Sequence, residues 1–175
     1  MKFLSDIRLL ILAIWLGAAI FFIAVAQSSF AVLPTRELAG SVVNRTLAIL
    51  NYGGLAISVL LILTSLLGAS RVNRLWLWVE RVSLVILAGM CAVGQFVIAF
   101  WLMSIRIQLG RPIDEVAMDD PLRIQFNSLH EYSRWALFAG MVSALIAFMV
   151  IANRKNDKGK SNVTDIYDFQ KEFKV

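Results

Sequence analysis

Residues 46–69 read TLAILNYGGLAISVLLILTSLLGA and contain no charged side chain. An α-helix needs about 20 mostly apolar residues to cross the ~30 Å of hydrocarbon in a bilayer. In that medium each backbone N–H and C=O group needs a partner inside the protein, and a helix supplies these partners within itself. The run therefore predicts a transmembrane helix.

Three more uncharged runs repeat this pattern, at Leu9–Gln27, Val82–Met103 and Trp135–Ala152. Hydrophobic residues make up 59% of the 175 residues, and the mean hydropathy is +0.73. A soluble domain contains about 45–50% apolar residues and has no interior large enough for this excess. We therefore predict an all-α, polytopic integral membrane protein, built as a four-transmembrane-helix bundle with the lipid bilayer as its surroundings.

The first run has an alternative interpretation as a secretory signal peptide. Met1–Arg8 would be its basic n-region, and Ala24-Val25-Ala26 matches a cleavage site. The apolar stretch is longer than a usual signal-peptide core, and Asp6 weakens the n-region. We expect an uncleaved helix.

The residues that flank these runs indicate where the helices begin and end. Asp120 and Pro121 are typical of an N-cap and a first helical position, and Pro34-Thr35 also reads as a helix start. Two helices should therefore extend outward beyond the membrane. We expect helices at residues 9–27, 35–69, 82–103 and 121–153, with a short loop at Ser70–Arg81 and a polar loop at Ser104–Asp119. They would form one transmembrane domain, residues 1–153, followed by a polar cytoplasmic tail, residues 154–175.

The positive charges predict the orientation of the helices. The net charge is +5, and with a cytoplasmic N-terminus every lysine lies on the inner side. The arginines left on the outer side are matched in number by acidic residues. By the positive-inside rule, both termini are cytoplasmic in a multi-pass protein of the cell membrane, which we take to be a bacterial inner membrane. The basic residues flank apolar runs instead of clustering with aromatic residues, which argues against nucleic-acid binding.

Small residues recur at helical spacing in several of the runs. In the last run Ala136, Gly140 and Ala144 are four residues apart. The same pattern occurs at Ala139, Ser143 and Ala147, at Ala13 and Gly17, and at Ala88 and Ala92. In lipid, small side chains let helix backbones approach each other closely. The pattern predicts a compact bundle, and it can equally serve a homo-oligomer or a membrane-protein partner.

Polar residues at membrane depth suggest where a site lies. Gln95 and Asn51 interrupt apolar runs, and His130 precedes the apolar part of the last helix. Two polar faces follow helical spacing: Glu37, Ser41, Asn44 and Asn51, and Arg123, Asn127, His130 and Arg134. Unpaired polar groups are costly in lipid, so these faces should turn toward each other in the outer half of the protein. They would form either an outward-facing pocket for an ion or small solute, or a hydrogen-bonded cluster that fixes helix register.

Other chemistry finds little support in the sequence. Cys91 and His130 are the single cysteine and histidine, which argues against a Cys/His metal site. The acidic residues Asp114, Glu115, Asp119 and Asp120 lack the spacing of a calcium loop. We find no catalytic triad or phosphate-binding loop and predict neither an enzyme, a metal nor a cofactor.

Two stretches resemble a bacterial family of four-helix membrane proteins of unknown function, related to eukaryotic transmembrane protein 205. One is Trp15-Leu16-Gly17 followed by residues 30–34 and 38–43, and the other is Phe126–Ser133, with the pattern F-x-x-L-H-x-x-S. The resemblance implies a four-helix bundle and singles out His130 and Ser133. The eukaryotic relatives hint at transport. The chain departs from the family pattern at Gln27, where a proline is expected, and at Arg134 and Trp135.

The sequence thus leaves two functional hypotheses. The first is a transport or solute-binding module whose binding residues are Glu37, Asn44, Asn51, Gln95, His130 and Ser133. The second is a structural or accessory subunit whose small-residue faces dock onto a larger membrane complex.

Overall fold

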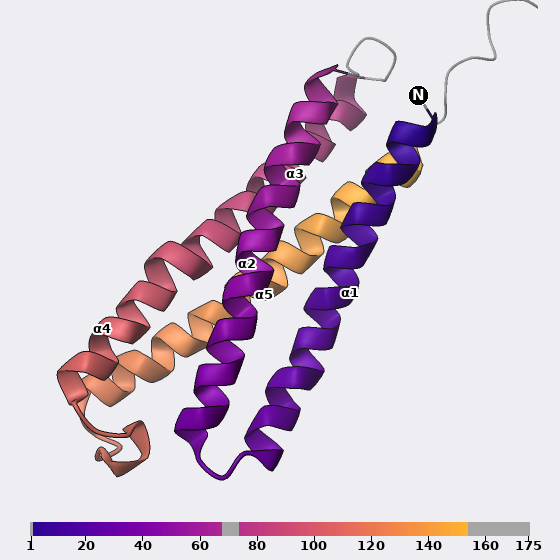
Figure 1. Cartoon of the computed structure of the whole chain (residues 1–175). Coiled ribbons are helices and arrows are strands. Elements are labelled where there is room, and N and C mark those ends of the chain that lie inside the picture. Colours follow the sequence, from indigo (N-terminus) through magenta and orange to yellow (C-terminus); the bar gives the residue numbers. More distant parts are fainter. Residues whose placement is uncertain (1, 68–73, 154–175) are drawn as a thin grey trace, which may run out of the picture.

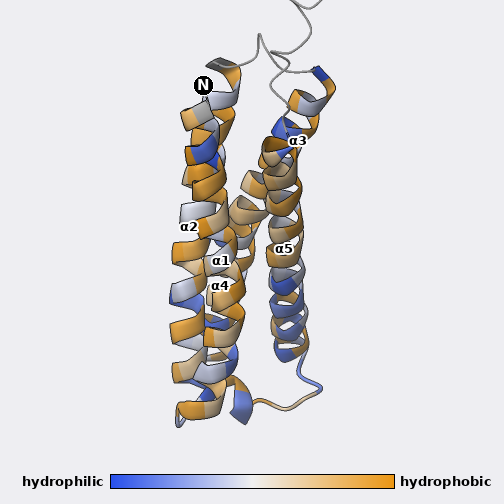
Figure 2. Ribbon diagram, turned by 90° about the vertical axis from the view of Figure 1, so that its right-hand side faces the viewer, coloured by the Kyte–Doolittle hydropathy of each residue, from blue (hydrophilic) through white to orange (hydrophobic). Residues whose placement is uncertain are grey.

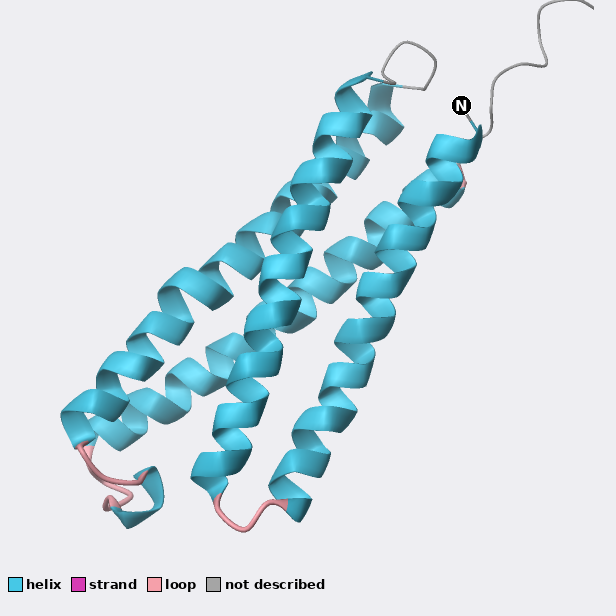
Figure 3. Ribbon diagram, in the orientation of Figure 1, coloured by secondary structure: helices cyan, strands magenta, loops and turns pink. Residues whose placement is uncertain are grey.

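The computed structural model describes residues 2–67 and 74–153, and this part of the chain contains helices but no strand (Figure 1, Figure 3). Figure 1 follows the elements in chain order, and Figure 3 shows the loops that join them. The elements are α1 Lys2–Val32, α2 Arg36–Leu67, α3 Arg74–Ala92, the π-helix η2 Val93–Ile98, α4 Ala99–Leu109, the 3₁₀-helix η3 Ile113–Glu115 and α5 Pro121–Ala152.

The elements α3, η2 and α4 follow one another without a break and act as a single long helix, Arg74–Leu109. Together with α1, α2 and α5 it gives four helices that are long and apolar enough to span a membrane. Large apolar side chains such as Phe21 (67% exposed) and Phe100 (68% exposed) point away from the bundle. Lipid is the medium that accepts such a surface. The chain is a multi-pass integral membrane protein with a four-helix bundle, as predicted.

The two ends of the bundle differ in kind (Figure 1). Lys2, Leu67, Arg74 and Ala152, where helices begin or end, mark what we call the N-terminal end. The opposite end, the loop end, carries the connections 33–35 and 110–120. Hydrophilic positions gather on the part of α5 nearest the loop end (Figure 2).

The helices are longer than the uncharged runs alone predicted. The first spans Lys2–Val32 instead of residues 9–27, and the third spans Arg74–Leu109 instead of residues 82–103. A charged residue marks the edge of the hydrocarbon, but a helix continues past that edge as long as no residue breaks it. The predicted loop at Ser70–Arg81 is therefore wrong for residues 74–81, which are helical, while residues 68–73 lie outside the described part.

Local sequence explains the helix ends at the loop end. Asp120 Oδ1 accepts a hydrogen bond from the Leu122 amide at 2.8 Å, with Pro121 in the first turn, as predicted. The polar loop expected from Ser104 begins later, because α4 continues to Leu109. It ends at Gly110, whose φ of 59° lies in the left-handed region that favours glycine.

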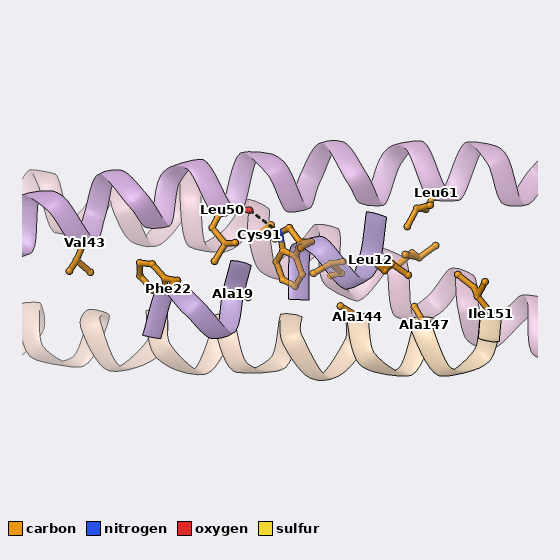
Figure 4. Packing of buried hydrophobic residues seen from close by; sticks show 13 residues of the cluster. Leu12, Ala19, Phe22, Val43, Leu50, Leu61, Cys91, Ala144, Ala147 and Ile151 are labelled. Atoms are coloured by element: carbon orange, nitrogen blue, oxygen red, sulfur yellow. Dashed lines mark hydrogen bonds between the residues drawn. The ribbon is translucent and has the colours of Figure 1, made fainter. Parts of the chain in front are cut away.

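The core joins all four helices and extends from Ile151, near the N-terminal end, to Phe22 and Val43, nearer the loop end (Figure 4). Leu12 and Ala19 of α1 are fully buried and belong to the same cluster as Leu61 of α2 and Ala144 of α5. Trp15 donates its indole N–H to the Leu50 carbonyl at 3.1 Å, which satisfies the one polar group of this large side chain.

The small residues pack inside the bundle on α5 but not on α1. Gly140, Ser143, Ala144 and Ala147 are buried, and α5 packs closely against α3. Ala13 and Gly17 are exposed, and a Cβ built on Gly17 meets no atom within 4 Å. The spacing alone did not show that this face of α1 looks outward from the bundle. The predicted tail, residues 154–175, lies outside the described residues.

Candidate functional site

A cavity of about 410 Å³ opens between α2, η2, α4 and α5 near the loop end. Its walls include every residue of the predicted polar cluster: Glu37, Asn44, Asn51, Gln95, His130 and Ser133. Pockets for small molecules commonly have volumes of about 300–1,000 Å³. The structure therefore places the sequence-predicted residues around one space of ligand size.

The wall formed by α2 follows from helical spacing. Glu37, Asn44 and Asn51 are seven residues apart, which is close to two turns, so their side chains lie on one face. At 1.5 Å per residue this face extends about 21 Å along the helix from Glu37 to Asn51. Glu37 and Asn44 are exposed at the mouth, whereas Asn51 is only 6% exposed. The cavity is thus a deep, narrowing space.

The π-helix η2 forms the deepest part of the wall opposite α2. Gly94, Gln95 and Ile98 all line the cavity. A Cβ on Gly94 would lie 3.1 Å from Asn51 Nδ2, so the absence of a side chain leaves room for the amide. Single π-helical turns within α-helices are frequent at functional sites, because they turn side chains away from regular register. No sequence pattern marked this turn.

The six sequence-predicted polar side chains of the cavity do not pair with one another. Within residues 2–67 and 74–153, the side chains of Glu37, Asn44, Asn51, Gln95 and His130 make no hydrogen bond to protein. Ser133 makes none either in this part of the chain. A cluster that fixes helix register requires such bonds. Polar groups that line a space without protein partners are instead available to water or a solute.

Four arginines line the cavity beside two carboxylates: Arg36, Arg106, Arg111 and Arg123, with Glu37 and Asp114. At the rim, Arg36 Nη1 lies 3.3 Å from Asp114 Oδ1, and both side chains are well exposed. Arg123 donates to the Val116 carbonyl. The cavity therefore carries more positive than negative charge.

Arg106 is a residue of the cavity wall that the sequence pattern did not predict. Its guanidinium carbon lies 5.4 Å from the centre of the Phe126 ring, and its Nη2 would be 3.2 Å from a Cβ on Gly40. The sequence analysis counted Arg106 as an outer-side charge, although Gln95, Ala99, Leu102 and Arg106 follow one helical face.

The two predicted polar faces are corrected at two positions. Ser41 is exposed and donates to the Leu38 carbonyl of its own helix at 2.8 Å, outside the cavity. Arg134 is also exposed and is not part of the wall. Gly40 and Ser133, the residues directly before them, do line the cavity. Helical spacing thus predicted the positions on the cavity wall to within one residue. This precision does not distinguish a residue on the wall from the next residue, which faces outward.

A second polar centre, near the N-terminal end, also escaped the sequence analysis. Arg8 of α1 forms an ion pair with Glu80 of α3 and donates to the Leu61 carbonyl of α2 at 2.9 Å. Arg8 is 5% exposed and Glu80 is fully buried. Arg81 next to this pair donates from Nε to Ser65 Oγ at 2.8 Å. These contacts join α1, α2 and α3 near the N-terminal end of the bundle.

Among the described residues, no three His, Cys, Asp or Glu side chains form a group that could hold a metal ion. In the acidic loop, Asp114 pairs with Arg36 and Asp120 caps α5. Both carboxylates thus have structural partners.

The fold and cavity define a class: a four-helix integral membrane protein with a polar cavity at one end of its bundle. The family model of the domain of unknown function DUF4149 matches residues 10–110, so the chain belongs to this family. The match covers α1 to α4 and ends before α5, which carries His130 and Ser133. Searches of the curated proteins and of the solved structures found no match.

Proposed function

We propose that this membrane protein is a non-enzymatic solute-binding module, and that the loop-end cavity holds a small solute or ion during transport. One observation carries the proposal: the six sequence-predicted polar side chains, from α2, η2 and α5, converge on a single space of about 410 Å³ without bonding to one another. Asn51 is the deepest case: the residue is 6% exposed, lines the cavity and makes no side-chain hydrogen bond inside the described chain, so its amide is available to water or a solute.

On the side toward the N-terminal end, the packed core closes the cavity. Next to Asn51 and Gly94, on the side of the core, lies a small void of about 10 Å³, lined in part by Trp15, Cys91 and Gly140. The Trp15 indole bonds to Leu50 and closes the path toward the N-terminal end. A solute therefore enters and leaves at the loop end, and passage through the bundle requires the helices to move.

We further propose that the loop end faces out of the cytoplasm in a bacterial inner membrane. The support is the lysine distribution: every lysine belongs to residues 1–8 or to residues 154–175. A phosphatase fused after Val175 should be inactive, and a fluorescent protein at the same position should be bright. An active phosphatase fusion would contradict the orientation.

A panel of small solutes tests the binding proposal. The protein in mild detergent is heated with inorganic phosphate, succinate, choline or glucose, since a ligand that binds the folded state raises Tm. At least one of these solutes should raise the Tm of the wild type and have no effect on Asn51→Leu or Gln95→Leu. Thr46→Val is the control, because Thr46 bonds to its own helix at Val42 outside the cavity. No shift with any solute, or equal shifts in all variants, would overturn the proposal.

One specific observation supports the accessory-subunit hypothesis: the small-residue face of α1 is exposed. Ala13 and Gly17 look away from the bundle, where a partner helix can approach closely. A partner that co-purifies in fixed ratio and is lost in Gly17→Leu would favour this role. The relation to eukaryotic transmembrane protein 205 stays a prediction, and we draw the transport role from the cavity instead.

A further inference from the structure

We propose that the cavity binds a small anion with a phosphate or carboxylate group, and that Arg106 is its principal charged ligand. This inference rests on the proposed binding function and names the chemistry of the solute. The evidence is the charge of the cavity wall, which no sequence motif predicted.

After the ion pair within the cavity wall is counted, the charge of the remaining lining residues is still positive. Of the four lining arginines, Arg36 is engaged with Asp114, one of the two lining carboxylates. The remaining lining charges are three positive and one negative: Arg106, Arg111 and Arg123, with Glu37. A cation entering this space would meet a net repulsion, whereas an anion is attracted and its on-rate is increased.

Arg106 is held in place but keeps its charge available. The Phe126 ring on α5 lies 5.4 Å from its guanidinium, and Gly40 on α2 gives it space at the other side. No ion pair to Arg106 occurs anywhere in the described chain. A guanidinium positioned by a ring and free of carboxylates can present its planar set of N–H donors to two oxygens of one anion.

The other lining groups supply the donors that an anion needs. The amides of Asn44, Asn51 and Gln95 and the hydroxyl of Ser133 can each donate a hydrogen bond into the space. Arg123, although it already donates to the Val116 carbonyl, has further N–H groups. Charge at the mouth and neutral donors at depth together suit a solute with one anionic group and a polar body.

Binding of inorganic phosphate and succinate to the detergent-solubilised protein tests this inference by titration calorimetry. Both should bind, and choline should not. Arg106→Gln should weaken binding roughly tenfold or more, because a hydrogen bond to a charged group is lost. Arg106→Lys should lose less, since it keeps the charge. Arg45→Gln is the control: it removes an arginine of α2 that is exposed and outside the cavity wall.

The anionic group can come from a soluble solute or from a lipid headgroup, and nanodiscs separate the two sources. If the ligand is soluble, phosphate binds equally in phosphatidylcholine and phosphatidylglycerol nanodiscs. If it is a lipid, phosphatidylglycerol raises the Tm of the wild type but not of Arg106→Gln, and phosphate binds more weakly in phosphatidylglycerol than in phosphatidylcholine nanodiscs. Either result supports the anion site.

Two other results would overturn the inference in distinguishable ways. If choline or glucose binds, needs Asn51 and ignores Arg106→Gln, the anion chemistry is wrong and the binding function stands. If no solute or lipid has an effect that depends on Arg106 or Asn51, both proposals fail.

Discussion

Arg8 and Glu80 form a buried ion pair between α1 and α3, although they lie 72 positions apart in the chain. Both residues lie near the first residues of their helices, at the N-terminal end of the bundle, and neither lines the cavity. Removing one partner of a buried pair leaves an uncompensated charge, which is far costlier than removing both.

We predict that Arg8→Leu and Glu80→Leu each destabilise the bundle by about 3–5 kcal/mol. The double variant should lose clearly less than the sum of the single changes. Unfolding in detergent with increasing SDS measures these free energies, and Asp6→Asn, an exposed acid on the same helix, is the control. Strictly additive losses would mean that the two side chains do not interact.

Two neighbouring glycines of α2 should respond oppositely to the same substitution. A Cβ on Gly54 would lie 2.5 Å from Cys91 Sγ and 2.9 Å from Trp15 Nε1, whereas one on Gly53 meets nothing within 4 Å. We therefore predict that Gly54→Ala costs about 1–3 kcal/mol of unfolding free energy. Gly53→Ala should be neutral or stabilising by up to about 1 kcal/mol. Equal Tm values for the two variants would contradict the packing of α2 against α1 and α3.

The small-residue faces of α5 and α1 should differ in the same way. Gly140 is buried, and its Cβ position lies 3.5 Å from Leu87 Cδ1 and 3.7 Å from Met90 Cβ. Gly140→Ala should fit, but Gly140→Leu should lower stability by about 1–3 kcal/mol or more through overpacking. Gly17→Leu should change stability by no more than about 0.5 kcal/mol, because its face is open. A larger loss from Gly17→Leu, measured by Tm in detergent, would reverse our assignment of the two faces.

The sequence predicted what depends on local pattern. Uncharged runs identified the transmembrane helices, and seven-residue spacing placed Glu37, Asn44 and Asn51 on one face, which now lines the cavity. Capping chemistry located the start of α5 at Pro121.

What the sequence did not predict depends on contacts between distant segments. Arg8 and Glu80 flank different runs, and nothing in either run indicates that they meet. Arg106 falls in the predicted polar loop, because polar residues mark the edge of the apolar run, but α4 continues to Leu109 and carries Arg106 onto the cavity wall. The π-helix η2 is a shift in backbone register, which composition does not record.

The central claim is that Gln95 and its neighbours line a water-accessible space inside the membrane-spanning part of the protein. The chain has one cysteine, Cys91, which is buried, so Cys91→Ala gives a background without reactive thiols. Gln95→Cys and Phe96→Cys are then compared in membranes, because Gln95 lines the cavity while Phe96 is 59% exposed on the outer surface.

The measurement is the rate at which each thiol reacts with a negatively charged methanethiosulfonate reagent that does not cross membranes. The reactive thiolate forms in water and not in hydrocarbon, so residue 95 should react at least about tenfold faster than residue 96. Inorganic phosphate or succinate should slow the reaction at residue 95 alone. Equal rates at the two positions, or no reaction at residue 95, would contradict the account.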